Sequence, residues 1–172
     1  MHALDVAVWA LLAVDVTADP LRGVDLLTTA VGSAVGAFLT TLAVGAVMVA
    51  LLPDYTDRMK AAVGSNPVGS LVYGLVSLVF LVLVTIVLVV TIIGILVAVP
   101  LLVLAYLVWA VGSAIAFLAI GERIVGTDDG WLKPLAVGAG INGALTLSGI
   151  GALVAFCIGA AGFGAVLRDW ND

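Results

Sequence analysis

The chain has 172 residues, of which 64% are hydrophobic and 10% are charged, and its mean hydropathy is +1.34. Soluble domains have about 45–50% apolar and about 25% charged residues, so this composition excludes an ordinary water-soluble domain and predicts an integral membrane protein. Eleven acidic and six basic residues leave a net charge of −5 and no basic patch, which argues against a nucleic-acid partner.

The N-terminal residues 1–27 predict an interfacial segment outside the membrane domain. Their apolar stretch, Val6–Val14, is bracketed by two aspartates and is shorter than the roughly 20 residues that a spanning helix needs. The start of the chain lacks the basic region of a signal peptide, and Asp19-Pro20 breaks helix continuity. Residues 28–170 are expected to form one helical-bundle domain in the membrane.

The first predicted span runs from Val31 to Leu52 without a charge, a rise of roughly 33 Å as a helix. Pro53-Asp54 ends it. The polar segment 54–67 is predicted to be a loop, in which residues 59–63 could form a short surface helix.

Two further spans are predicted in the charge-free stretch from residue 61 to 121. That stretch is too long for one crossing, and Gly94 and Pro100 weaken helix continuity near its middle. We therefore expect helices over residues 68–90 and 99–120, joined by an apolar turn at 91–95.

The last uncharged stretch, residues 134–167, is too long for one straight span, and Ser148-Gly149-Ile150-Gly151 splits it. The halves, 134–147 and 152–167, predict a glycine-rich helical hairpin that crosses the bilayer fully or partly. The predicted fold is thus all-α: three transmembrane helices plus this C-terminal hairpin, four to five membrane helices in total.

Lysine and arginine positions predict the orientation. If the final hairpin returns to its origin, one side of the membrane holds five basic residues and the other holds Arg22. The basic side is expected to face the cytoplasm, so the N-terminus of this multi-pass cell-membrane protein would lie outside and the C-terminus inside. The five basic residues are Arg58, Lys60, Arg123, Lys133 and Arg168.

Small residues predict where helices approach one another. Gly32 and Gly36 form a G-x-x-x-G pair, and Thr41 and Gly45 continue a stripe at four-residue spacing. The stripe could pack within this chain or form a homo-oligomer interface. The amide of Asn142 needs a partner inside its span, which a neighbouring helix or a bound solute could supply.

Few residues could carry chemistry. The predicted spans hold no ionisable side chain of the kind that ion-coupled transporters place at mid-membrane, although a passive pore needs none. His2 is the sole histidine and Cys157 the sole cysteine. We therefore expect no catalytic centre, metal or cofactor.

The order of local motifs resembles a known membrane domain. Pro53-Asp54 ends the first helix, Asn66-Pro67 opens the second, Thr91–Ile95 makes the turn, and Gly121-Glu122-Arg123 closes the third. A glycine-rich hairpin follows, opened by Trp131-Leu132-Lys133-Pro134. This arrangement is similar to a domain that occurs alone in halophilic archaea, or at the C-terminal end of bactofilin-type polymer-forming cytoskeletal proteins.

The resemblance implies a membrane anchor or assembly partner for a bactofilin-like filament that affects cell shape. It carries over no catalytic residues. Loops around Arg58, Lys60, Arg123 and Lys133 would then be the contact surface, and the excess of acids would suit a high-salt cytoplasm. The alternative reading from the residues is a passive channel or small-solute transporter.

Overall fold

The computed structural model describes residues 20–127 and 130–169, and every regular element in these ranges is an α-helix. This confirms the predicted all-α class. The helices are α2 (Pro20–Leu51), α3 (Pro53–Ser65), α4 (Pro67–Val89), α5 (Ile92–Val125), α6 (Leu132–Thr146) and α7 (Gly149–Asp169).

Four segments are long and apolar enough to cross a membrane, which is compatible with a multi-pass membrane protein. The four are Leu27–Leu51, Pro67–Val89, Gly94–Val125 and Gly149–Asp169. α6 has 15 residues, a rise of about 22 Å, which is less than the roughly 30 Å of a bilayer's hydrocarbon core.

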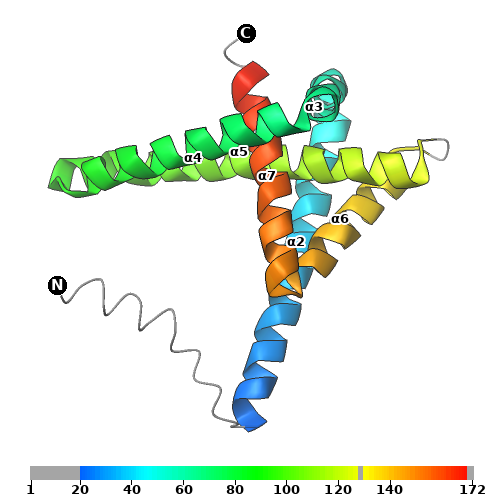
Figure 1. Cartoon of the computed structure of the whole chain (residues 1–172), viewed down its shortest axis with the longest axis horizontal. Helices are drawn as coiled ribbons and strands as arrows, with labels where there is room; N and C mark the ends of the chain where they lie inside the picture. Colours follow the sequence, from blue (N-terminus) through cyan, green and yellow to red (C-terminus); the bar gives the residue numbers. More distant parts are fainter. Residues whose placement is uncertain (1–19, 128–129, 170–172) are drawn as a thin grey trace.

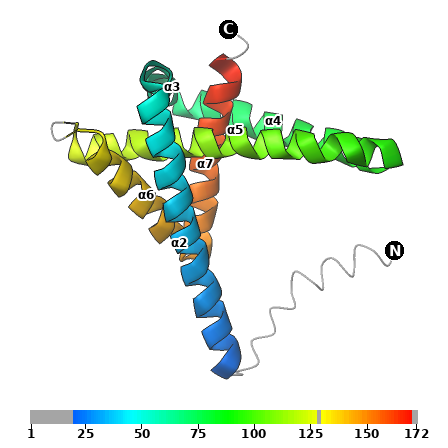
Figure 2. The ribbon, with the colours of Figure 1, turned by 180° about the vertical axis from the view of Figure 1, so that it is seen from behind.

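The helices form two arms that diverge from a common end (Figures 1 and 2). One arm is the hairpin of α4 and α5, and the other consists of α2, α6 and most of α7. α4 and α5 form one long hairpin, and α7 passes between them, with Ala160 against Gly74 of α4 and Gly162 against Gly112 of α5. α6 leads from the end of α5 toward the start of α7, and α2 packs on α5 and α6. The short helix α3 lies where the two arms meet.

The core lies at this common end. Met48 of α2, Met59 of α3, Ile115 of α5 and Val166 of α7 form one buried cluster. Away from it the long helices expose large apolar side chains, as expected where lipid replaces water as the solvent.

Glycines permit the helix crossings. A Cβ atom on Gly74 of α4 would collide with the Ala160 carbonyl of α7, and one on Gly112 of α5 would collide with the backbone at Gly162. Since no hydrophobic force drives helices together in lipid, such backbone-level approach supplies dispersion contact instead. Some glycines of the C-terminal hairpin, Gly162 and Gly164 among them, thus pack against other helices of the chain.

The turn between α4 and α5 differs from the prediction. α5 begins at Ile92, not near residue 99, and Pro100 lies inside it. The Thr91 hydroxyl accepts a 3.0 Å hydrogen bond from the Gly94 N–H and caps the helix immediately after the turn. Pro100 would break a helix in water. In apolar surroundings no water competes for the backbone hydrogen bonds, so α5 continues through this proline.

Other boundaries also shift. The segment after the first span is a 13-residue helix, not the five residues expected, because Thr56 and Met59 bury one side of it. Residues 20–27 of the predicted interfacial segment are continuous with α2. The rest of that segment, residues 1–19, lies outside the described residues. The predicted final hairpin is present, with its break at residues 147–148.

Candidate functional site at the charged end

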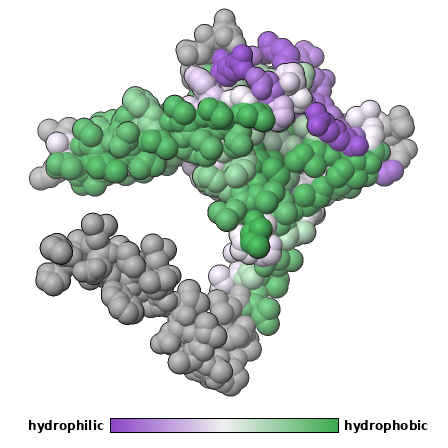
Figure 3. Space-filling view, viewed as in Figure 1, coloured by the Kyte–Doolittle hydropathy of each residue, from purple (hydrophilic) through white to green (hydrophobic). Residues whose placement is uncertain are grey.

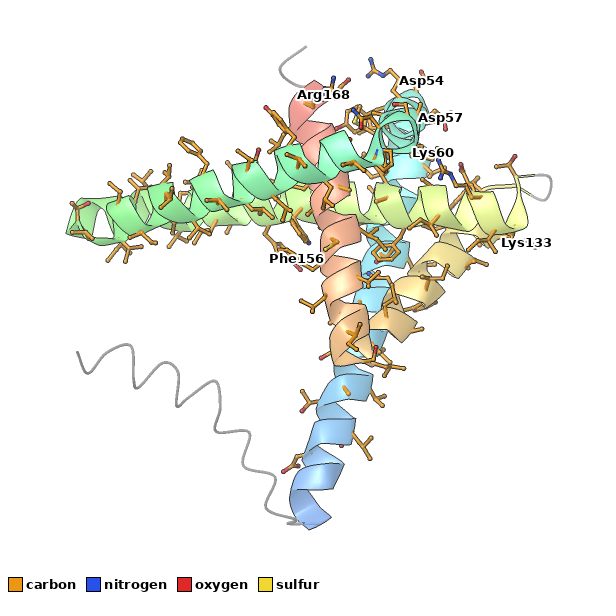
Figure 4. The ribbon with its side chains drawn as sticks, viewed as in Figure 1. Asp54, Asp57, Lys60, Lys133, Phe156 and Arg168 are labelled. Atoms are coloured by element: carbon orange, nitrogen blue, oxygen red, sulfur yellow. The ribbon has the colours of Figure 1, made fainter. Side chains whose placement is uncertain are left out.

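Charged side chains gather where the arms meet. Figure 3 shows the hydrophilic residues over this end and hydrophobic surface along the α4–α5 arm. Figure 4 places Asp54, Asp57 and Lys60 on α3 beside Arg168 at the end of α7, with Lys133 at the start of α6. The described charged residues of α5, α6 and α7 lie in the first or last turn of their helices, whereas those of α3 are spread along it.

Lys60 is the centre of an ion-pair network. Its ammonium lies 2.7 Å from Asp57 Oδ1 and donates a 2.6 Å hydrogen bond to Glu122 Oε1 of α5. The side chains of Lys60 and Glu122 are 17% and 20% exposed. Burial alone would lower the pKa of Lys60, but the hydrogen bonds to both carboxylates outweigh it, and the pKa is raised above its ordinary value.

The other three predicted contact residues are exposed. The Arg58 guanidinium lies 5.9 Å from the centroid of the Tyr55 ring. Arg123 donates a long, 3.4 Å hydrogen bond to the Gly64 carbonyl, and Lys133 lies at the start of α6. Arg58, Arg123 and Lys133 are therefore accessible, whereas Lys60 is committed to contacts within the chain and is a poor contact residue.

Tyr55 is partly buried between this surface and the core. Its pKa is raised, first by burial and then by the nearby charge of Asp169, against a lowering effect of Arg58. α3 and α7 are in contact, which brings Asp169 at the end of α7 near this tyrosine. The phenol thus stays protonated, and neutral, through the physiological range.

The predicted packing residues divide into two groups. Asn142 donates a 2.8 Å hydrogen bond to the Thr41 hydroxyl, which confirms that a neighbouring helix satisfies its amide. A Cβ on Gly45 would collide with the Leu135 side chain, so Gly45 also lies in the α2–α6 contact. At Gly32 and Gly36 a Cβ would meet no described atom within 4 Å. No described residue packs closely on these two glycines, so packing within the chain and a homo-oligomer contact both stay predictions there.

A cavity of about 750 Å³ opens beside the ion pairs, between α3, α5 and α7. Asp57, Lys60, Glu122 and Arg123 line one part of it, and alanines of α5 and α7 line another. Within the described ranges no three His, Cys, Asp or Glu side chains group as a metal site would require. The arrangement suits the binding of charged or amphiphilic groups.

Sequence reasoning missed Glu122 and Asp57 as partners of Lys60. Asp57 is three residues from Lys60, a spacing that places both on one helix face and could have been recognised once α3 was expected to be a full helix. The pairing with Glu122 joins residues 62 positions apart, so no local sequence pattern predicts it.

Comparison with known proteins finds one family. The sequence profile of a family described as "Domain of unknown function (DUF8173)" matches residues 1–172. Neither the curated proteins nor the solved structures include a match.

Proposed function

Since the chain belongs to the DUF8173 family, whose description assigns no activity, we propose its function from its geometry and its motifs: it is a membrane anchor or assembly partner for a bactofilin-like cytoskeletal filament. The observation that carries the proposal is α3, a charged helix held rigidly at one end of an otherwise apolar molecule. This is the part of the described surface best suited to a protein partner.

α3 has one buried and one exposed side. Thr56 and Met59 are each 1% exposed and fix the helix against α2, α5 and α7. Asp54, Asp57 and Arg58 are exposed on the other side. A contact surface that is already ordered loses little conformational entropy on binding, which favours a docking role.

We place this end in the cytoplasm. Arg58, Arg123, Lys133 and Arg168 are exposed there, and lysine and arginine are enriched on the cytoplasmic side of membrane proteins. In this arrangement the N-terminus lies outside. The α6–α7 hairpin then starts and ends on the cytoplasmic side.

The filament partner follows from the resemblance in the Asn66-Pro67 opening, the Thr91–Ile95 turn and the glycine-rich final hairpin. Because every regular element of the described residues is a helix, the filament-forming unit would lie outside them and dock on α3. The expected consequence of losing the anchor is mislocalised filament and altered cell shape.

Site-specific photocrosslinking tests the docking surface. A photoreactive residue replacing Arg58 should crosslink to a bactofilin-type protein in cells. The matched control replaces Val103, which is 54% exposed on the α4–α5 arm, and should crosslink to lipid but not to that protein. Absence of a filament protein from the Arg58 adducts, with intact cell shape in a deletion strain, contradicts the proposal.

Cysteine labelling tests the orientation separately. In a Cys157→Ala background, Asp54→Cys should react with a membrane-impermeant maleimide only after the cells are opened. Val90→Cys, at the far end of the α4–α5 arm and 82% exposed in the native protein, should react in intact cells. The reverse pattern would invert the assigned topology.

A second candidate, a passive conduit for a small solute, is favoured by a polar cavity of about 280 Å³ between α2, α5 and α6. Thr41, Ser113 and Asn142 line it. Proteoliposomes should then pass a small neutral solute such as glycerol faster than empty liposomes. The Asn142→Leu variant should abolish the difference, and equal rates for wild-type and empty vesicles would reject this function.

A further inference from the structure

We propose that the cavity beside α3 is the head-group end of a binding groove for one phospholipid, with the phosphate on Arg123 and an acyl chain along α7. This inference does not rest on the filament proposal, since it concerns a different ligand.

The first argument is continuity. Pro67, Ile158 and Ala161 line the 750 Å³ cavity and also line a second groove of about 410 Å³ between the start of α4 and α7. The two spaces therefore adjoin along these three residues. Together they form one continuous groove that is charged at one end and apolar at the other.

The second argument is the composition and direction of the apolar part. Ile150, Leu153, Val154 and Cys157 recur at three- and four-residue spacing and so occupy one face of α7. From residue 150 to residue 161 this face rises about 16 Å, roughly half of a 30 Å hydrocarbon core. The groove follows α7 toward the charged end for about the depth of one leaflet, which matches an acyl chain better than a compact solute.

The third argument is charge complementarity at the mouth. Lys60 is held by Asp57 and Glu122, so its ammonium is already compensated. Arg123 is exposed, and its bond to the Gly64 carbonyl is long, at 3.4 Å. A guanidinium has five N–H donors in a planar fork that fits two phosphate oxygens.

The charges also indicate the type of head group. Two carboxylates and two basic groups line the cavity, so their formal charges cancel. A multiply anionic head group would meet Asp57 and Glu122 without compensation. A single phosphodiester, paired locally with Arg123, is therefore the expected ligand.

Native mass spectrometry of the purified, delipidated full chain tests the site with dioleoylphosphatidylcholine as the probe. We expect one lipid per chain. Arg123→Gln should weaken binding about tenfold or more, as expected for loss of a hydrogen bond to a charged group. Arg58→Gln, which removes an equivalent exposed charge outside the groove, should leave binding unchanged.

Two further arms separate the lipid from its parts. Dioleoylglycerol, with the same chains and no phosphate, should bind at least about tenfold more weakly than the phospholipid. Inorganic phosphate should not displace the bound phospholipid. If dioleoylglycerol binds equally well, or if phosphate alone competes, the assignment of a phospholipid is overturned.

A variant in the apolar part guards against misfolding of the Arg123 variant. Leu153 is 67% exposed, so Leu153→Trp can be accommodated in the fold while filling the groove. It should reduce phospholipid binding without lowering the melting temperature. Unchanged binding in both Leu153→Trp and Arg123→Gln would overturn the proposal.

Discussion

The ammonium of Lys60 and the carboxylate of Glu122 lie 2.6 Å apart although 62 residues separate them in the chain. This pair fastens α3 to the end of α5. Because both side chains are mostly buried, 17% and 20% exposed, the contact is shielded more than a surface ion pair is, and removing one partner leaves the other charge poorly solvated.

Removal of the ammonium is the first prediction. Lys60→Met should destabilise the protein by about 1–3 kcal/mol, the range for losing a hydrogen bond to a charged group. The melting temperature in mild detergent measures the effect. The double variant Lys60→Met, Glu122→Met should recover part of the loss, because it removes the mostly buried carboxylate, whereas the remaining partner, Asp57, is 70% exposed and is solvated by water. If the double variant is as destabilised as the sum of the two single variants, the two residues are not coupled.

Alkaline pH provides the second prediction. The pKa of Lys60 is raised in the folded protein above the ordinary value of 10.5, so the folded state holds this proton more tightly than the unfolded state. The resulting stability is fully present below about pH 10.5 and is lost as the pH rises through the folded-state pKa. Melting temperatures measured from about pH 9 to about 12 should therefore fall more steeply for wild type than for Lys60→Met. Parallel curves would show that Lys60 does not link folding to pH.

The helix crossing gives the third prediction. A Cβ on Gly164 would lie 2.9 Å from the Gly74 Cα and would also collide with the Ser70 carbonyl. Gly164→Ala should therefore separate α4 from α7 and cost about 1–3 kcal/mol or more. Gly140→Ala is the matched control, because a Cβ there meets no described atom within 4 Å. It should be neutral, or stabilising by up to about 1 kcal/mol through helix propensity. Equal melting temperatures for the two variants would show that the close contact between α4 and α7 does not contribute to stability.

The cap at the α4–α5 turn gives the fourth prediction. Thr91→Val keeps the shape of the side chain but deletes the acceptor of the Gly94 N–H bond. A loss of about 1–2 kcal/mol is expected, as for other N-caps. Hydrogen exchange should accelerate at residues 92–95, whereas Thr91→Ser should behave as wild type. Slow exchange in Thr91→Val would mean that another group satisfies these amides.

The first residues of three helices can be predicted from a local pattern, although the start predicted for α5 was wrong. Asn66, Thr91 and Ser148 each accept a hydrogen bond from the glycine N–H three residues later. The pattern of a polar cap followed at the third position by glycine is visible in the sequence. Helix α5 was instead predicted to start at residue 99, beside Pro100, because proline breaks helices in water. In apolar surroundings it does so less readily.

The packing stripe shows where local pattern was insufficient. Gly32 and Gly36 carry the strongest motif, yet Thr41 and Gly45 make the contact with α6. A G-x-x-x-G spacing states only that a close approach is sterically possible on that face. Which helix comes to the face depends on connections and contacts elsewhere in the chain.

The amino-acid sequence by itself determined which segments are apolar helices, where most of them end, and that several are long and apolar enough to cross a membrane. Those properties depend on local composition and on backbone hydrogen bonding within each helix. Only the tertiary structure decided that the arms diverge from a common core, that Lys60 joins Glu122, and that Gly74 lies against α7. The physical reason is that lipid solvates every apolar helix face about equally well, so hydrophobicity does not select one helix pairing over another. Close backbone contacts and ion pairs make that selection, and they join residues far apart in the chain.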